Sequence, residues 1–340
     1  MNILIIGGAG YIGSHVCREL LDQGHWITVY DNLSSGLREN LFSDAEFVHG
    51  DILDYPSLVR AMTGSTTHAF GDAGSFDAVI HLAAFKAAGE SMISPEKYSL
   101  NNIAGTINIL NAMGVAGIRL FVFSSSAAVY GEPEYLPIDE SHPTNPENFY
   151  GFTKLEIERI ASWYEKLKGI RYASLRYFNA AGYDIQGRIR GLEQNPANLI
   201  PVIMETAMGL QEEVRIFGDD YDTPDGTGVR DYVHVNDLAT GHGAALNYLD
   251  STFKSITVNL GSEQGFSVME ILNAARRISG QAIPARVVER RRGDPAKLTA
   301  SARYAQEALG WKAQHSDLDT IIQTTWDAYQ RSMPDAEERT

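Results

Sequence analysis

The stretch "NILIIGGAGYIGSHVCRELLDQG" (2–24) decides the fold, because it joins an apolar strand to a helix through a turn rich in glycine. A continuous apolar run ends in glycines, and a helical pattern follows over 11–24. Without side chains at Gly7, Gly10 and Gly13, the backbone can approach a pyrophosphate and the helix can pack closely on the strand. This order of elements predicts a dinucleotide-binding turn.

An acidic residue ends the second predicted strand, "HWITVYD" (25–31), 18 residues after Gly13. At that place Asp31 can accept hydrogen bonds from a ribose and would repel a 2′-phosphate, which favours NAD over NADP. FAD fits the same turn, and a glycine turn without a ligand remains the alternative. Asp51, in "HGDI" (49–52), is a candidate adenine contact, although acids at strand ends are more often simply solvated.

Further short apolar runs alternate with helical patterns in the first half of the chain. They are "AEFVHGD" (45–51), "FDAVIHLAA" (76–84), "RLFVFSSS" (119–126) and "RYASLRYFN" (171–179). Strands that are buried on both faces and separated by helices predict an α/β fold with a doubly wound parallel sheet of the Rossmann type. The small residues of 64–75 indicate a solvated insertion between two of these elements.

After about residue 180 the chain becomes rich in Gly, Pro, Asn and charge, which is typical of loops that carry binding groups. A helix is expected from Asn236 onward, and "SITVNLG" (255–261) reads as another buried strand. We therefore expect an NAD-binding domain over 1–180, with returning segments at about 232–261. A smaller mixed α/β lobe over 181–340 is interleaved with it and ends in a polar tail.

The size and net charge of the chain limit the kinds of partner that the protein can bind. A chain of 340 residues with 44% apolar content can bury a large core, and its size favours more than one lobe. Its 43 acidic and 28 basic side chains give a net charge of −15, which disfavours binding to nucleic acid or anionic membranes. An anionic substrate would need local arginines.

A single cysteine, Cys17, excludes an intramolecular disulfide and fits a reducing compartment. We find no basic leader and no run of the ~20 apolar residues that a membrane span needs, so we expect a cytoplasmic protein. The nine histidines and the one cysteine show no metal-binding spacing, and no metal is expected.

The motif "YGFTK" (150–154) places Tyr150 and Lys154 one helical turn apart. The ordinary tyrosine pKa near ~10 is too high for a base at neutral pH. A fixed ammonium, together with the positive nicotinamide ring of NAD, would favour the phenolate. Ser126 ends the strand over 119–126, where ligands bind in open α/β sheets, and could steady a substrate oxygen. The spacing is common by chance, but its place behind the glycine turn favours catalysis.

These residues resemble the extended short-chain dehydrogenase/reductases. The resemblance rests on "GGAGYIGSH" (7–15), on Ser126, Tyr150 and Lys154, and on "RYFNAAG" (176–182). Further motifs resemble the family of UDP-glucose (UDP-galactose) 4-epimerases over nearly the whole chain. They are "FSSSAAVYG" (123–131), "NLIP" (198–201), "IFGDDYDTPDGTGVRDYVHV" (216–235) and "RRRGDPA" (290–296).

The resemblance implies roles for the reactive residues. Tyr150 would be the base and acid at the sugar 4-hydroxyl, Ser126 its hydrogen-bonding partner, and Lys154 would bind the nicotinamide ribose and lower the tyrosine pKa. The expected cofactor contacts are Gly7, Gly10, Tyr11, Ile12, Gly13, Asp31, Asn32, Asp51, Ile52, Leu82, Ala83, Ala84, Lys86, Asn102, Ser124, Tyr150, Lys154 and Tyr177.

The resemblance also implies a nucleotide site in the second lobe. Arginines can fork onto phosphate oxygens, and an aspartate can accept from both ribose hydroxyls. The expected substrate contacts are Ser126, Tyr150, Asn179, Asn198, Leu199, Arg215, Phe217, Arg230, Arg291, Asp294 and Leu298. On period alone Phe217 could equally be a core residue, and the basic run over 290–292 could be solvated.

The implied activity interconverts UDP-galactose and UDP-glucose by transient oxidation at C4 with tightly bound NAD, turning of the 4-keto sugar and hydride return. Ala127 and Ala128 stand where the family commonly has a helper hydroxyl, and Leu298 stands where some members have a large aromatic. A UDP-N-acetylhexosamine or UDP-pentose 4-epimerase is therefore an alternative. A 4,6-dehydratase, a decarboxylase and a non-catalytic dinucleotide sensor are weaker ones.

The resemblance also suggests a homodimer. The helices that begin near Pro95 and Tyr150 would pair across a two-fold axis as a four-helix bundle, with outward apolar residues such as Ile157 and Tyr164.

Overall fold

The computed structural model describes residues 1–64, 75–193, 198–291 and 294–332. The insertion expected over 64–75 and the polar tail fall almost wholly outside these residues.

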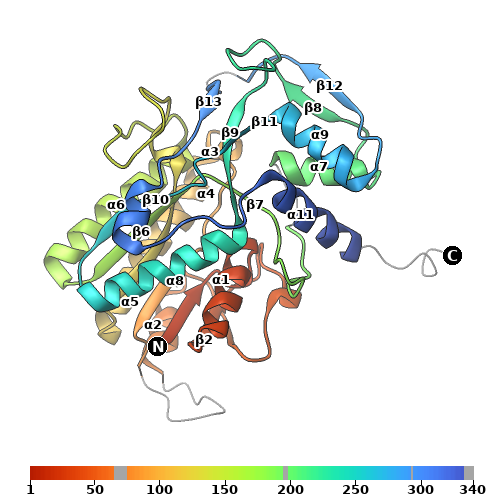
Figure 1. Cartoon of the computed structure of the whole chain (residues 1–340). Coiled ribbons are helices and arrows are strands. Elements are labelled where there is room, and N and C mark those ends of the chain that lie inside the picture. The colour runs from red at the N-terminus through yellow and green to blue at the C-terminus, as the bar shows by residue number, and fades with distance from the viewer. Residues whose placement is uncertain (65–74, 194–197, 292–293, 333–340) are drawn as a thin grey trace.

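A seven-stranded parallel sheet forms the centre of the larger lobe, in the order β10-β6-β5-β4-β1-β2-β3 (Figure 1). Its strands are β1 (Asn2–Ile6), β2 (Trp26–Asp31), β3 (Glu46–His49), β4 (Ala78–His81), β5 (Leu120–Ser126), β6 (Arg171–Tyr177) and β10 (Ile256–Leu260). This order is that of a doubly wound dinucleotide-binding sheet extended by one strand at the β6 edge. The predicted fold class is confirmed, and the expected strand over 255–261 is β10.

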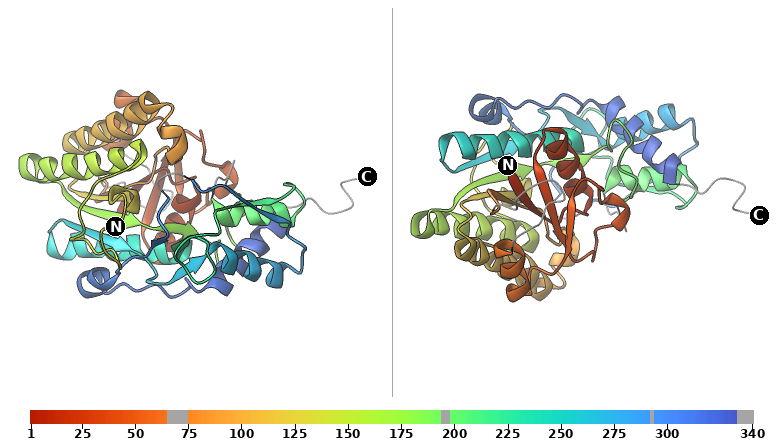
Figure 2. Two further views of the ribbon diagram at one scale, coloured as in Figure 1. Left: turned by 90° about the horizontal axis from the view of Figure 1, so that it is seen from above. Right: turned by 90° about the horizontal axis from the view of Figure 1, so that it is seen from below.

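Helices cover both faces of this sheet (Figure 2). The first layer holds α1 (Tyr11–Asp22), α8 (Val235–Thr252) and α10 (Arg303–Leu309), and the second holds α2 (Tyr55–Thr63), α5 (Gly105–Ala116) and α6 (Phe149–Lys168). In β1, Ile3 and Ile5 pack into the first layer, whereas Leu4 and Ile6 pack into the second, as alternation along a strand requires. No helix among the described residues combines the length and apolar content of a bilayer span.

Short segments connect β4 to α5 and β5 to α6. They are α3 (Ala88–Ser91), α4 (Pro95–Tyr98), the π-helical turn η2 (Ser99–Ala104) and the 3₁₀ turn η3 (Ala127–Val129), while a further 3₁₀ turn, η1 (Arg38–Asn40), follows β2. The predicted strand over 76–84 already ends at His81, so residues 82–87 form a loop beyond the carboxyl end of the sheet. Loops at that end are where ligands bind in this architecture.

The smaller lobe has its own core, built around Ile203, Ile271 and Trp326. Its sheets contain β7 (Asn179–Ala181), β9 (Val229–His234), β11 (Gly265–Ser267) and β13 (Lys297–Leu298), and, separately, β8 (Val214–Phe217) with β12 (Ala285–Val288). Its helices are α7 (Leu199–Ala207), α9 (Val268–Ser279) and α11 (Leu318–Ser332). The green and blue segments of Figure 2 place this lobe beside one end of the larger one.

Ile157 does not lie on an outer surface, contrary to the expectation from sequence. It is 1% exposed and packs in the same cluster as Ile109 of α5, which runs against α6. Because α5 covers that side of α6 within the same chain, the outward apolar positions of α6 are instead Phe152, Trp163 and Leu167, which are 40%, 59% and 70% exposed. Tyr164 is partly buried against the same core.

The close packing of α1 on β1 predicts a sharp cost for a methyl group at Gly13. A Cβ there would lie 2.1 Å from the Gly7 carbonyl oxygen. We expect Gly13→Ala to lower the free energy of unfolding by about 1–3 kcal/mol, as overpacking does. Gly114→Ala is the matched control, since a Cβ at this exposed position of α5 meets nothing within 4 Å. Alanine should stabilise α5 by roughly 0.5–1 kcal/mol. The denaturant midpoints of unfolding measure the stability of both variants. Equal midpoints for Gly13→Ala and Gly114→Ala would contradict the close approach of α1 to the turn after β1.

Candidate functional site

The glycine turn forms a cradle for a dinucleotide. Gly7 has a φ of +85°, and a Cβ there would lie 2.5 Å from the backbone nitrogen of Ala83. Gly10 caps α1 without any side-chain cap, so the first backbone N–H groups of this helix remain available to an anion. The turn therefore suits the pyrophosphate of NAD.

A small cavity of about 80 Å³ lies beside this turn. Predicted cofactor residues that line it are Gly7, Gly10, Asp31, Asn32, Ile52, Leu82, Ala83 and Ala84. The Asp31 carboxylate accepts from the backbone nitrogens of Ala9 (3.0 Å) and Leu33 (2.8 Å), and burial raises its pKa. These bonds fix the carboxylate at the end of β2 and leave it lone pairs for a ribose, so the residues present fit the adenosine end of NAD.

Asp51 lies next to this cavity and supports it. Its carboxylate accepts from the Asn32 side chain at 2.9 Å and from the Leu53 nitrogen at 2.8 Å. A direct contact with adenine stays a prediction.

Asn102 holds the loop that follows β4. The two ends of its amide bond the backbone nitrogen and oxygen of Phe85, each at 3.0 Å, and its Nδ2 also reaches Thr153. The π-helical turn η2 carries this buried amide, and such turns often occur at functional sites. The neighbouring Lys86 forms an ion pair with Glu193 of the smaller lobe and so links the loop after β4 to that lobe. Its contact with the cofactor stays a prediction.

Tyr150 lies in the first turn of α6, near Ser126 at the end of β5, and the Ser126 hydroxyl favours the ionised form of its phenol. The helix begins there because the Asn148 side chain caps it, accepting from the Gly151 nitrogen at 2.9 Å. Any side chain at Gly151 would collide with the Ala128 carbonyl, since a Cβ would lie 2.3 Å from that oxygen. The glycine after the tyrosine therefore lets α6 approach the end of β5.

Lys154 lies one turn further along and is 2% exposed. Its Nζ donates to the Ser124 carbonyl at 2.6 Å and lies 5.7 Å from the centre of the Tyr150 ring. Burial lowers the pKa of Lys154 to about 7, and the Glu158 carboxylate opposes that shift. Ser124 also lies near Tyr177, whose hydroxyl bonds His242. The expected triad is thus brought together with two of the expected cofactor residues.

In the chain alone, burial raises the pKa of Tyr150 to about 12, while its hydrogen bond with Ser126 opposes the shift. Lys154 is not among the groups that shift this pKa, so the lowering expected from it stays a prediction, while removal of the phenol from water disfavours its anion. Ionisation near neutral pH therefore requires the additional positive charge of the oxidised nicotinamide ring.

Two neighbouring cavities share Asn179, Arg230 and Asp294, and the smaller of them reaches Ser126 of the triad. The smaller, of about 270 Å³, is also lined by Ser126, Ala127, Ala128, Tyr177 and Leu298. The larger, of about 760 Å³, is also lined by Asn198, Leu199, Arg215, Phe217 and Arg291. The predicted substrate residues other than Tyr150 line one or both cavities, and residues from both lobes meet where the cavities adjoin.

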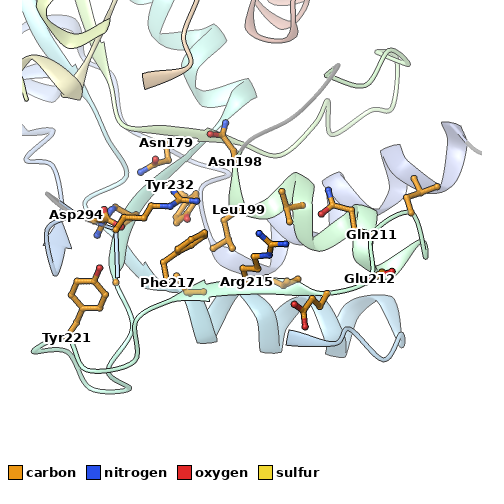
Figure 3. A pocket seen from close by; sticks show the side chains of 18 residues that line it. Asn179, Asn198, Leu199, Gln211, Glu212, Arg215, Phe217, Tyr221, Tyr232 and Asp294 are labelled. Carbon is orange, nitrogen blue, oxygen red and sulfur yellow. The ribbon is translucent and has the colours of Figure 1, made fainter. Parts of the chain in front are cut away.

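Aromatic and charged contacts define the larger cavity (Figure 3). In this view Phe217, Leu199 and Arg215 lie between Asp294 on one side and Gln211 on the other.

The Arg291 guanidinium lies 3.8 Å from the centre of the Phe217 ring, so Phe217 is a wall of the cavity and not a core residue. Arg230 forms an ion pair with Asp294. Both groups are thus held at the junction of the cavities.

Sequence reasoning missed Glu158 and the cavity residues Gln211, Tyr221 and Tyr232. An available signal for Glu158 was its place four residues after Lys154 on one helix. No comparable spacing marks Gln211, Tyr221 and Tyr232. These residues come together only because the fold places β8, β9 and their loops side by side.

The chain is similar to known nucleotide-sugar epimerases over nearly its whole length. The model of the NAD dependent epimerase/dehydratase family matches residues 3–261. A UDP-glucose 4-epimerase from Lacticaseibacillus casei is 46% identical over 327 residues, which are 96% of each chain. The structure of UDP-glucose 4-epimerase from Brucella ovis in complex with NAD has a TM-score of 0.91 and 43% identity, covering 96% of this chain and 98% of that one.

A third similar protein was solved with a nucleotide sugar. UDP-glucose-4-epimerase from Stenotrophomonas maltophila, with bound NAD and formylated UDP-arabinopyranose, has a TM-score of 0.91 and 42% identity. The match covers 100% of this chain and 99% of that chain.

The larger cavity predicts that Arg291 contributes to nucleotide binding. We expect Arg291→Ala to weaken the affinity for UDP about tenfold or more, because a charge-assisted bond to phosphate is lost. Arg277→Ala is the matched control, since Arg277 pairs with Asp319 at an exposed place and neither residue lines either cavity. Titration calorimetry with UDP measures both variants. Equal affinities would show that Arg291 does not reach the nucleotide.

Proposed function

This chain belongs to the NAD dependent epimerase/dehydratase family, and from that premise we propose that it interconverts UDP-galactose and UDP-glucose. The observation that carries the proposal is the proximity of Tyr150 and Lys154 on α6 to Ser126, which lines a cavity that adjoins a larger one in the smaller lobe. When bound, NAD accepts a hydride from C4 of the sugar and returns it to the opposite face.

The side chains of the protein supply the proton chemistry. The Tyr150 phenolate takes the proton of the sugar 4-hydroxyl, and the phenol later returns a proton to the oxygen of the 4-keto sugar. The hydroxyl of Ser126 hydrogen-bonds that oxygen and the phenol. Lys154, held by the Ser124 carbonyl at 2.6 Å, adds positive charge on the same helix face as Tyr150. No net oxidation of the sugar occurs over the cycle.

An epimerase must hold the nucleotide tightly and the sugar loosely, so that the keto sugar can turn without leaving. The larger cavity offers arginines, amides and an aromatic wall for the nucleotide. The smaller one has the apolar Ala127, Ala128 and Leu298 among its lining residues, although Glu147 and Asn148 line it as well. This unequal distribution supports epimerisation over a 4,6-dehydratase, which would need an acid and base pair beside Ser126.

A second candidate function is 4-epimerisation of UDP-N-acetylhexosamines or of UDP-pentoses. It is favoured by Leu298, which lines the smaller cavity and takes less room than a large aromatic would. The Stenotrophomonas maltophila relative was solved with a modified UDP-pentose. Leu298 and the ligand of this relative both concern which sugar the pocket accepts. The proposed reaction at C4 is the same for either substrate class.

The decisive variant is Tyr150→Phe, which keeps the ring and removes the proton donor. We expect turnover of UDP-galactose to fall by about 10²–10⁴-fold, the usual contribution of an acid–base group. The assay uses purified protein without added cofactor and follows each epimer from UDP-galactose, UDP-N-acetylgalactosamine and UDP-xylose. Tyr164→Phe is the control, since its hydroxyl bonds Asn111 away from the triad. Unchanged turnover in Tyr150→Phe would refute the mechanism, and conversion of the pentose alone would change the substrate.

The remaining proposals concern organisation. We infer that residues 1–180, with returning segments at about 232–261, bind NAD, and that the rest of 181–340 binds the UDP-sugar. A cytoplasmic location also stays a proposal. A homodimer is supported by exposed apolar side chains on the outer side of η2 and α6, where Leu100 and Trp163 are 58% and 59% exposed.

Charge on this outer side should prevent dimer formation. We expect Leu100→Glu to convert a dimeric mass into a monomeric one, because a carboxylate would be buried at the contact. Tyr304→Glu on α10 is the control, since Tyr304 is 42% exposed on a different helix layer. Light scattering gives the mass in solution. A monomeric wild-type protein would exclude this assembly.

A further inference from the structure

A third ionisable residue continues the line of Tyr150 and Lys154 along α6. Glu158 stands four residues after Lys154, and four residues advance a helix by about 6 Å with little rotation. It is 7% exposed, although a carboxylate is costly to bury unless it is paired. The function proposed above does not yet use this residue.

Glu158 is held by two partners from the central sheet. Arg176 of β6 forks onto it, with Nε to Oε1 at 3.0 Å and Nη2 to Oε2 at 2.6 Å. Ser125 of β5 donates its hydroxyl to Oε1 at 2.5 Å. The carboxylate thus ties α6 to the strand that carries Ser124 and Ser126, one residue to either side of Ser125.

The network continues behind the triad. Arg176 Nη1 donates to the Tyr130 hydroxyl at 2.9 Å, and that hydroxyl donates to Asn259 of β10 at 2.6 Å. Breaking a buried pair is costly, but replacing one by apolar residues is often neutral for stability. Stability alone therefore does not require charge at this place, and a role toward the triad accounts for it better.

We propose that Glu158 is a positioning residue for the reaction: its carboxylate keeps the buried ammonium of Lys154 charged and holds the serine end of β5 against α6. The proposal rests on the proposed function, because it concerns the state of the lysine beside the catalytic tyrosine.

Among the residues that the structure describes, the other groups that face Lys154 do not supply a negative charge. Tyr150 is a neutral phenol in the chain alone, and Ser124 offers its carbonyl and hydroxyl. Burial and the nearby ammonium lower the pKa of His81 to about 3, so this imidazole is neutral.

Glu158 is the carboxylate that opposes the loss of the proton from Lys154, whose pKa burial lowers to about 7. Arg176 pairs with the same carboxylate. Glu158 nevertheless raises the pKa of Lys154.

The test compares Glu158→Gln with Glu165→Gln. Glu165 is a close match because it lies on the same helix and also accepts from an arginine (Arg171, 2.9 Å) and a serine (Ser255, 2.7 Å). It lies seven residues further from the triad. Protein with ¹³C-labelled lysine is titrated by NMR, and the Lys154 signal is identified by its loss in Lys154→Met. Turnover of UDP-galactose is followed against pH in parallel.

We expect Glu158→Gln to lower the pH at which Lys154 loses its proton, and Glu165→Gln to leave it unchanged. Removing the carboxylate destabilises the ammonium, so activity should be lost at lower pH on the alkaline side. At a pH one unit above the wild-type midpoint, turnover should fall roughly tenfold, and on the acidic side it should stay within about twofold. Glu158→Asp, which keeps the charge, should restore most of the wild-type profile.

An unchanged Lys154 titration in Glu158→Gln would overturn the proposal. If the unpaired Arg176 prevents folding of this variant, Glu158→Gln/Arg176→Met removes both charges, and a smaller lowering is expected because the loss of the Arg176 cation offsets part of the loss of the carboxylate. The NMR titration needs no turnover, so a protein inactive on UDP-galactose could still support or refute the role of Glu158.

Discussion

The removal of the Lys154 ammonium and of the partly buried Tyr150 phenol from water is the constraint on which the rest of the structure depends. Burial alone disfavours both the phenolate and the ammonium, as the pKa of about 12 for Tyr150 and of about 7 for Lys154 express. The fold opposes this with fixed groups: the Ser124 carbonyl accepts from the ammonium, and Ser126 hydrogen-bonds the phenol. In the proposed mechanism the remaining positive charge that favours the phenolate comes from the oxidised cofactor. Tyr150 therefore acts as a base only when the dinucleotide is bound.

The two lobes divide the remaining work. The parallel sheet presents the glycine turn, Asp31 and the triad at one edge, because the carboxyl ends of its strands meet there. The smaller lobe contributes arginines and Phe217 to a larger cavity, and Arg230 with Asp294 stands where this cavity meets the smaller one. In the proposed function this arrangement concentrates binding strength on the nucleotide and leaves the sugar free to turn.

Much of this was predictable from sequence. Apolar runs, glycines and the acid at Asp31 predicted the sheet and its turn, since local patterns determine these features. The cavity residues followed from family resemblance. The pairing of Arg230 with Asp294, the stacking of Arg291 on Phe217 and the core position of Ile157 did not follow, because each depends on contacts between distant segments.

The most direct test of the account is the near-ultraviolet absorbance of the Tyr150 phenolate, taken as wild type minus Tyr150→Phe, in protein loaded with NAD. The account predicts that the phenolate band is present near neutral pH and that it weakens when the cofactor is reduced. A band that appears only at the pH of about 12 set by burial would contradict the claim that this tyrosine acts as the base.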